Sequence, residues 1–357
     1  MTGYVVSARE LKNWCADLMG EFSVIGPVLA KRGQAIFEKV DNPDRIFLKY
    51  RSTMLSPRRF IYPSCRTLLE IERDLNRCVE APSGDAANPL LFAVHPCDMQ
   101  AISVLDRVLL GDYRDLHYEK MRKAAVTVVL NCAKACERGF CASMGSGPFL
   151  KLREGYDVEL TRLRPDAGGE EDIYLVEYGS KRGKRLIERG GRMKKADKKA
   201  FEEKVGLEAE ASRSLKRRLD TDGLVDILSR NLDHPVYRRT AEEKCLGCTN
   251  CTMVCPTCYC YNISDETSLD LKRTVRKRQW DSCQELNFAR VHGGNFRSSR
   301  EARLRQFVTH KLCTWVEQYG CFGCVGCGRC MTWCPTGIDL AEMADEIRRD
   351  DKPGPVK

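Results

Sequence analysis

Two groups of four cysteines with the same spacing are the residues of this sequence best suited to metal and redox chemistry. The pattern C-x2-C-x2-C-x3-C-P occurs twice, with its cysteines at Cys245, Cys248, Cys251 and Cys255 and again at Cys324, Cys327, Cys330 and Cys334. One such run supplies three thiolates to a 4Fe-4S cluster, and in proteins with two clusters its fourth Cys binds the other cluster. The duplication therefore predicts two clusters and a chain that carries electrons.

Crossed ligation follows from the same rule. We expect one cluster among Cys245, Cys248, Cys251 and Cys334, and the other among Cys324, Cys327, Cys330 and Cys255. A proline after each run, Pro256 or Pro335, fixes φ and sets the direction in which the chain leaves. Zinc is the alternative, because paired C-x2-C elements commonly bind it, but zinc sites do not need the added x3-Cys-Pro. Disulfides are a weaker third interpretation.

A further group of cysteines lies earlier in the chain, at Cys97, Cys132, Cys136 and Cys141. Cys97 follows one apolar run that is expected to form a strand, and Cys132 follows another. These thiols could meet, because sites gather at the C-terminal ends of strands in open α/β sheets. Two interpretations stay open: a third 4Fe-4S cluster, or buried free thiols that behave as small apolar residues.

The remaining cysteines have no spacing that decides their role. Cys258, Cys260 and Cys283 lie in PTCYC and WDSC, and could bind another cluster or serve a redox role at an interface. Cys321 stands three residues before Cys324 and could offer an alternative ligand. Ordinary core or surface positions are expected for Cys15, Cys65, Cys78 and Cys313.

The elements that must position these residues indicate an α+β protein of two domains. Hydrophobic patterning predicts strands at 90–96, 124–130, 157–163 and 172–179, a helix over 98–111 and a loop at 164–172. Strands separated by helical segments favour a mixed or parallel sheet with helices on its faces. Residues 1–235 are therefore predicted to form an α/β domain, which ends in a charged helical stretch at 182–230.

Residues 236–357 are predicted to form a ferredoxin-like domain with two 4Fe-4S clusters. A compact ferredoxin needs a far shorter connection between its motifs, so residues 257–320 are expected to fold as a helical insertion. Within the insertion, HGGNFR (292–297) lacks the strand and helix that flank a phosphate loop, and its glycines are expected to let the backbone pass close to a cluster or another segment. The tail at 350–357 is expected to be disordered.

Length and composition fit a cytoplasmic protein. The 357 residues exceed the usual size of one domain, and we find neither a secretory signal at the start nor an apolar stretch long enough to cross a bilayer. Twenty cysteines without an export signal indicate a reducing compartment, and they favour metal binding over disulfides.

The charge is basic and unevenly distributed. The formal net charge is +9, and two clusters with their thiolates lower it to roughly +5. Much of the excess lies at 181–218, which could dock an acidic partner or nucleic acid, although its interspersed acids favour a solvated helical face. Because no aromatic residues are interleaved there, we expect no nucleic-acid binding, and we expect no membrane insertion.

Several strings occur in an order that is typical of a known family: HPCDMQAISVLD, FCASMGSGP, AEEKCLGCTNCTMVCPTCYC, RQWDSC, HGGNFR, RLRQFVTHKL and GCVGCGRCMTWCPTGIDL. Together they resemble the 4Fe-4S dicluster electron-transfer subunits. That family includes the iron–sulfur electron-transfer subunit of anaerobic sulfite reductase and the beta subunit of cytosolic nickel–iron sulfhydrogenases, and similar subunits accompany flavin oxidoreductases linked to heterodisulfide reductase. The resemblance covers about residues 45–345. One departure is that Gly139 stands where the family usually has the first Cys of a Cys-x-Cys pair, so that either Cys136 replaces it or the third site is altered.

The resemblance implies a cytoplasmic subunit that relays electrons between two other subunits, namely a flavin-containing NAD(P)H reductase and a terminal redox enzyme. It places the eight motif cysteines as cluster ligands, and Cys97, Cys132 and Cys141 at motif positions of the N-terminal part. The flavin is expected on the partner, since the chain shows no dinucleotide fingerprint, Walker loop or Ser/His/Asp set. We accordingly expect no catalytic residues and a non-catalytic electron-transfer subunit. The alternative is that the chain is itself an iron–sulfur reductase of a sulfur compound.

Overall fold

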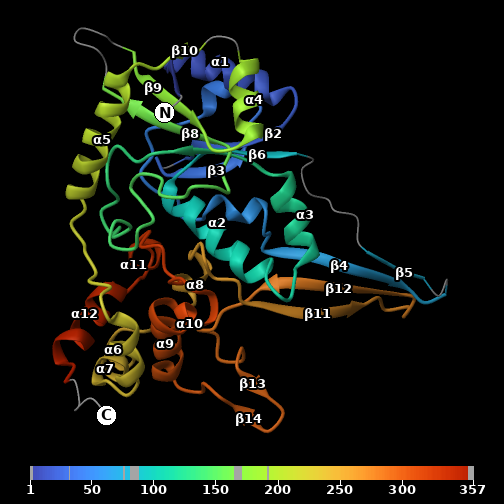
Figure 1. The fold of residues 1–357 in the computed structure, drawn as a ribbon. Helices are drawn as coiled ribbons and strands as arrows, with labels where there is room; N and C mark the ends of the chain where they lie inside the picture. Colours follow the sequence, from blue (N-terminus) through green and yellow to red (C-terminus); the bar gives the residue numbers. More distant parts are fainter. Residues whose placement is uncertain are drawn as a thin grey trace.

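The computed structural model describes residues 3–31, 33–74, 77–80, 88–164, 171–190 and 193–352 (Figure 1). Helices and strands are mixed, which confirms the α+β fold class. Most of the loop expected at 164–172 and the end of the tail at 350–357 lie outside the described residues. Within the described ranges, no helix is both long enough and apolar enough to span a membrane.

The N-terminal part is built on an eight-stranded mixed sheet. Its strands are, in spatial order, β10 (Lys194–Lys195), β1 (Gly3–Ser7), β9 (Ile173–Tyr178), β8 (Val158–Leu163), β7 (Val126–Leu130), β6 (Pro89–Val94), β2 (Ser23–Leu29) and β3 (Ala35–Lys39). The four strands β8, β7, β6 and β2 run parallel, and the outer pairs are antiparallel. All residues of β6 and β7 are buried, as expected for parallel strands covered on both faces. The predicted strands and the mixed sheet are confirmed.

Helices cover both faces of this sheet (Figure 1). On one face, α1 (Ala8–Met19) and α4 (Lys181–Arg189) pack against alternate strand residues, and the Trp14 indole N–H donates to the Leu186 carbonyl at 3.0 Å. On the other face lie α2 (Pro96–Leu109) and α3 (Leu116–Ala124), while α5 (Lys198–Arg213) packs on β8 and β9. The predicted helix over 98–111 is confirmed as α2, which starts directly after β6.

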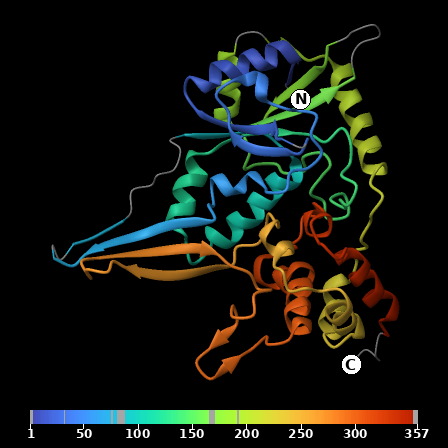
Figure 2. The ribbon, with the colours of Figure 1, turned by 180° about the vertical axis from the view of Figure 1, so that it is seen from behind.

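A second, antiparallel sheet joins two strands from the N-terminal part of the chain and two from the C-terminal part. Its order is β11 (Tyr261–Thr267), β12 (Arg273–Trp280), β4 (Cys65–Glu72) and β5 (Arg77–Glu80), and it projects from the body of the molecule (Figure 2). The prediction of a helical insertion at 257–320 is therefore wrong for its first part, although its later part is helical. The reason is a tertiary contact, because the charged hairpin of β11 and β12 pairs through β12 with β4, which is far away in the sequence.

The C-terminal part packs helices around one apolar core. Its elements are α6 (Leu224–Arg230), α7 (Pro235–Glu243), α8 (Asn250–Met253), α9 (Arg300–Thr309), the π-helix η3 (His310–Thr314), α10 (Trp315–Tyr319), α11 (Arg329–Thr332) and α12 (Leu340–Asp350). Leu219, Leu224 and Leu228 pack in the same core as Leu304 and Ile347. The stretch from Leu219 to about residue 235, which we assigned by sequence to the N-terminal domain, thus shares its core with the C-terminal part. Short 3-10 turns, η1 (Pro43–Arg45) and η2 (Pro57–Phe60), lie in the N-terminal part.

The glycines of HGGNFR form the turn of a small hairpin, β13 (Arg290–Val291) and β14 (Gly294–Asn295). Gly293 has φ +96°, a conformation that L side chains rarely adopt, and an added Cβ at either Gly293 or Gly294 meets nothing within 4 Å. The expectation that these glycines allow a close approach to a cluster or another segment is wrong. The hairpin needs them for its backbone conformation alone.

Several basic residues of the segment 181–218 form ion pairs with neighbouring acids. Lys204 lies between Glu159, at 2.7 Å, and Glu177. Arg182 forms an ion pair of 2.7 Å with the buried Asp157, and Arg217 pairs with Asp339. These pairs favour the interpretation of the segment as helical faces with interspersed acids.

Two helical glycines give a matched test of this packing. Gly183 in α4 lies so close to the sheet that a Cβ would stand 1.8 Å from the Asp157 carbonyl oxygen, whereas a Cβ on the exposed Gly206 in α5 meets nothing within 4 Å. We expect Gly183→Ala to lower the free energy of unfolding by at least about 2 kcal/mol. Gly206→Ala should raise it by about 1 kcal/mol, because Ala favours the helix. Denaturant unfolding followed by circular dichroism measures both, and equal effects of the two variants would contradict the packing described.

Candidate metal centres

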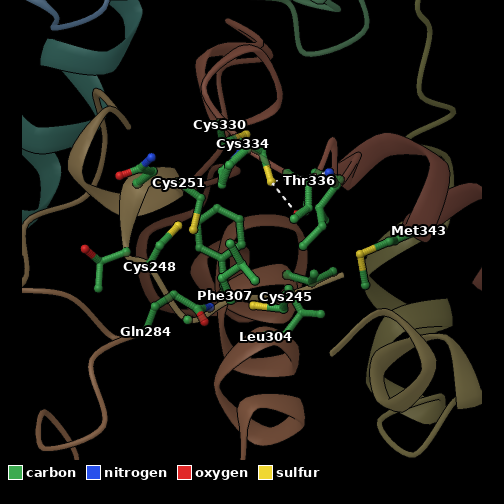
Figure 3. Close-up of a pocket in the computed structure, with 18 residues that line it drawn as sticks. Cys245, Cys248, Cys251, Gln284, Leu304, Phe307, Cys330, Cys334, Thr336 and Met343 are labelled. Atoms are coloured by element: carbon green, nitrogen blue, oxygen red, sulfur yellow. Dashed lines mark hydrogen bonds between the residues drawn. The ribbon is translucent and has the colours of Figure 1, made fainter. Parts of the chain in front are cut away.

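The cysteines of the first motif, with one cysteine of the second, surround a hollow beside α8 (Figure 3). Cys245, Cys248 and Cys251 face Cys334 across this space, which has an empty volume of about 580 Å³ and also touches Cys330. The remaining wall is mostly apolar, with Leu304, Phe307 and Met343. We call this space the first hollow. It contains the four thiols that crossed ligation predicts for one cluster.

A second hollow lies next to the first one and holds the complementary set. Cys255 of the first motif joins Cys324, Cys327 and Cys330 of the second around an empty volume of about 340 Å³. Thr257 and Lys311 complete its polar wall. The structure thus brings each fourth cysteine to the three cysteines of the other motif.

Both motifs reach this geometry through the same backbone turn. In the first motif Gly247 and Thr249 flank Cys248 with φ +64° and +66°, and in the second Gly326 and Gly328 flank Cys327 with φ +61° and +75°. Left-handed residues on both sides of the middle cysteine curl the loop around the hollow. Thr249 adopts this conformation without being glycine, which is uncommon and consistent with a constrained site.

The N-terminal cysteines form a third hollow. Cys97 lies in the first turn of α2 just after β6, and Cys132 lies just after β7, so the ends of two adjacent parallel strands bring them together. Cys136 and Cys141 close the ring from the following loop, around an empty volume of about 310 Å³. Gly139 also borders this hollow, next to Cys136. The Cys136 thiol also donates to the Arg51 carbonyl at 2.9 Å.

Close packing of backbones joins the third hollow to the second motif. A Cβ on Gly326 would lie 2.7 Å from the Phe140 carbonyl oxygen, and a Cβ on Gly328 would lie 2.5 Å from that of Arg138. The Phe140 N–H donates to the Gly326 carbonyl at 2.8 Å. These two glycines are needed both for their left-handed φ and because no side chain fits between the segments.

The three hollows form a continuous row. Cys330 borders both the first and the second hollow, and Cys327 borders both the second and the third. Neighbouring redox groups held in these hollows would thus be separated by single side chains. Such proximity is what one-electron transfer between successive groups requires.

Comparison with known proteins agrees with this geometry. Residues 244–338 match a family described as a 4Fe-4S dicluster domain. The chain is also 35% identical over 317 residues to the sulfhydrogenase 2 subunit beta of Pyrococcus furiosus, an alignment that covers 87% of this chain and 88% of that protein. The chain belongs to the sulfhydrogenase beta-subunit family of 4Fe-4S dicluster proteins. By its name, the Pyrococcus relative is one subunit of a sulfhydrogenase.

A buried ion pair ties the two parts of this sulfhydrogenase-type subunit together between the second and third hollows. Arg329, placed between Cys327 and Cys330, donates to both oxygens of Asp98 at 2.8 and 2.7 Å, and to the Thr53 carbonyl at 2.8 Å. The two charged side chains are 2% and 0% exposed. Sequence reasoning missed Arg329 as a site residue, although its position inside the second motif was a signal.

Burial raises the pKa values of several thiols that line the hollows. It raises the pKa of Cys136 to about 11 and that of Cys141 to about 12, and it raises the pKa values of Cys97 and Cys132 well above the usual range. Burial likewise raises the pKa of Cys324 to about 12. Without a bound group these thiols are therefore neutral at pH 7. A metal group that binds thiolates would release their protons and supply the compensating positive charge.

The donor set in the hollows fits a 4Fe-4S cluster. At least four thiols line each hollow, the walls are otherwise mostly apolar, and backbone N–H groups point at sulfur, as in the Gly326 N–H to Cys324 contact of 3.3 Å. Tetrahedral zinc with Zn–S bonds of about 2.3 Å requires sulfurs roughly 3.8 Å apart. Among the described residues, no group of three or more His, Cys, Asp or Glu side chains is arranged to hold a single metal ion.

The remaining cysteines of this sulfhydrogenase-type subunit lie outside the three hollows. Cys258 contacts the thiol of Cys255, and Cys260 contacts that of Cys283. Cys321 lies near Arg107 and borders none of the three hollows, so it is not placed as an alternative ligand. As expected, Cys15 and Cys313 are buried in the core, while Cys65 and Cys78 are exposed.

Proposed function

We propose that this chain is the electron-relay subunit of a cytoplasmic multisubunit oxidoreductase. The observation that carries the proposal is the continuous row of three cysteine-lined hollows, in which neighbours share Cys330 or Cys327. A bound 4Fe-4S cluster supplies one-electron oxidation and reduction. The residues of the chain hold such groups in sequence and exclude water from them with apolar walls.

The assignment of ligands follows the three hollows. Cys245, Cys248, Cys251 and Cys334 would hold the first cluster, and Cys324, Cys327, Cys330 and Cys255 the second. Cys97, Cys132, Cys136 and Cys141 would hold a third. Thr257 and Thr336 place hydroxyl groups 3.2 and 3.4 Å from the sulfurs of Cys255 and Cys334, where they can donate to thiolates.

The partners proposed are, at one end of the row, a flavin-containing NAD(P)H-reductase-like subunit, and at the other end, a terminal redox enzyme subunit. The terminal subunit would be of sulfite reductase, nickel–iron hydrogenase/sulfur reductase or heterodisulfide reductase type. The Pyrococcus relative, itself a sulfhydrogenase subunit, supports an assembly with other subunits. The flavin is assigned to the partner because the chain lacks a dinucleotide fingerprint. A cytoplasmic location agrees with twenty cysteines that include no disulfide among those described.

Anaerobic reconstitution of the full chain, followed by iron and sulfide assay, tests the proposal. Two clusters give about eight irons per chain, and a third raises the total to about twelve. Reduction should develop the electron paramagnetic resonance (EPR) signals of reduced 4Fe-4S clusters. Markedly fewer than about eight irons would sink the dicluster assignment.

The third hollow can be tested separately at Cys136. Because its thiol closes the ring, Cys136→Ala should lower the iron content by about four per chain while the EPR signals of the other clusters persist. Cys321→Ala is the matched control, since Cys321 is also partly buried but borders no hollow, and it should keep the full iron content. An unchanged iron content in Cys136→Ala would remove Cys136 from the ligands.

One cavity favours the second candidate, a reductase of a small anionic sulfur compound. A polar cavity with an empty volume of about 810 Å³ lies beside the third hollow and is lined by Cys132 together with Lys49, Arg51 and Lys134. The isolated, reconstituted chain with a chemical electron donor and sulfite or polysulfide decides between the two functions. Turnover would establish the reductase, whereas inactivity of a fully loaded chain supports the relay.

A further inference from the structure

Lys311 is a fully buried cation in the wall of the second hollow. Its side chain is 3% exposed, and its ammonium donates to the Thr257 hydroxyl at 2.8 Å and lies 4.6 Å from the centre of the Trp315 ring. It comes from the π-helix η3, and such irregular turns occur frequently at functional sites. Of the described side chains that line the second hollow, Lys311 is the one that carries a formal charge apart from the cysteines.

No carboxylate among the described residues forms an ion pair with this ammonium. A buried, unpaired ammonium is costly, so a negative charge is needed nearby. Although burial lowers the pKa of Lys311, the neighbouring thiolates, Cys255 first, raise it above its ordinary value. A negatively charged group held by the thiols of the second hollow, whose wall includes Lys311, would supply that charge.

The other two hollows lack such an unpaired cation among the residues described. The polar side chains of the first hollow, such as Gln284, carry no charge. Apart from cysteines, no described side chain that lines the third hollow carries a charge, and Arg329, between the second and third hollows, is paired with Asp98. The second hollow, which lies in the middle of the row, is thus electrostatically distinct.

We propose that Lys311 raises the reduction potential of the second cluster above that of the first, so that an electron on the first cluster passes to the second. This inference depends on the proposed relay function. A 4Fe-4S cluster with its four thiolate ligands carries a charge of about −2. One-electron reduction adds a further negative charge to it. A fixed positive charge in a water-poor wall favours that addition. Lys311 is a positioning residue: it acts on the electron and takes no part in bond formation.

The test is an EPR-monitored redox titration of the reconstituted full chain. Lys311→Met removes the charge and keeps an apolar side chain of similar length. We expect this variant to lower the equilibrium constant for reduction of the second cluster at least tenfold. For a one-electron couple this lowers the reduction potential by about 59 mV, while the first cluster keeps its potential. Lys311→Arg, which keeps the charge, should restore most of the shift. Lys216→Met, which removes an exposed lysine, should change neither potential.

The possible outcomes separate the role of Lys311 from the relay function. An unchanged second potential in Lys311→Met, with full iron content, would overturn the inference and leave the relay function intact. Should Lys311→Met and Lys311→Gln both lose the iron of the second hollow while Lys311→Arg keeps it, the requirement for a positive charge is supported. Loss of that iron in all three variants means that the shape of the lysine matters, and the electrostatic role fails. Absence of clusters from the unmodified chain instead defeats the proposed function.

Discussion

Cys334→Ala is expected to empty the first hollow, although Cys334 belongs to the second motif. The structure places its sulfur with Cys245, Cys248 and Cys251, so the loss of one thiolate leaves that ring with three ligands. We expect about four fewer irons per chain and loss of one EPR signal, while the second cluster persists. Cys255→Ala should do the reverse and deplete the second hollow.

Cys65→Ala provides the control, because Cys65 is an exposed thiol that borders none of the three hollows, and the iron content of this variant should equal that of the unmodified chain. If each motif instead held one cluster with its own four cysteines, Cys334→Ala would spare the first cluster and damage the second. Signals assigned to each cluster by removing Cys248 or Cys324 separately would distinguish the two cases.

The second large effect concerns the ion pair of Arg329 and Asp98. Replacing either partner, as Arg329→Met or Asp98→Asn, leaves a charge or its donors buried without compensation. We expect each single variant to lower the free energy of unfolding by about 3–5 kcal/mol. Anaerobic denaturant unfolding, followed by circular dichroism, measures the loss.

The double variant Arg329→Met/Asp98→Asn separates the pair from its surroundings. It should lose much less than the sum of the two single variants, because no unpaired charge remains. The exposed pair of Arg276 and Asp265, at 44% and 45% exposure, is the matched control and should change stability little when either residue is replaced. Additive losses at Arg329 and Asp98 would refute a coupled buried pair.

Much of this site could be predicted because its information is local. The cysteine spacing of the two motifs identifies both sets of four thiols, including the exchange of Cys255 and Cys334. The apolar runs that became β6 and β7 are short and continuous, so their strand character was evident, and it placed Cys97 and Cys132 at adjacent strand ends.

The parts that escaped prediction depend on partners far away in the chain. Arg329 and Lys311 look like ordinary basic residues until the fold buries one against Asp98 and the other against Thr257. The hairpin of β11 and β12 carries many charges and becomes a strand pair because β4 offers it an edge. The local sequence does not indicate such contacts, because pairing with a distant strand can outweigh the local preference of a segment for helix or strand.

The exchange of cysteines between motifs has a consequence for how the protein is made. During synthesis Cys245, Cys248 and Cys251 emerge well before Cys334, so the first hollow stays open on one side until the second motif has left the ribosome. The third hollow has all four thiols early, but its wall includes Gly326 and Cys327. Loading of the proposed clusters would therefore have to follow synthesis of the second motif, and a chain that is truncated before residue 324 lacks part of the lining of all three hollows.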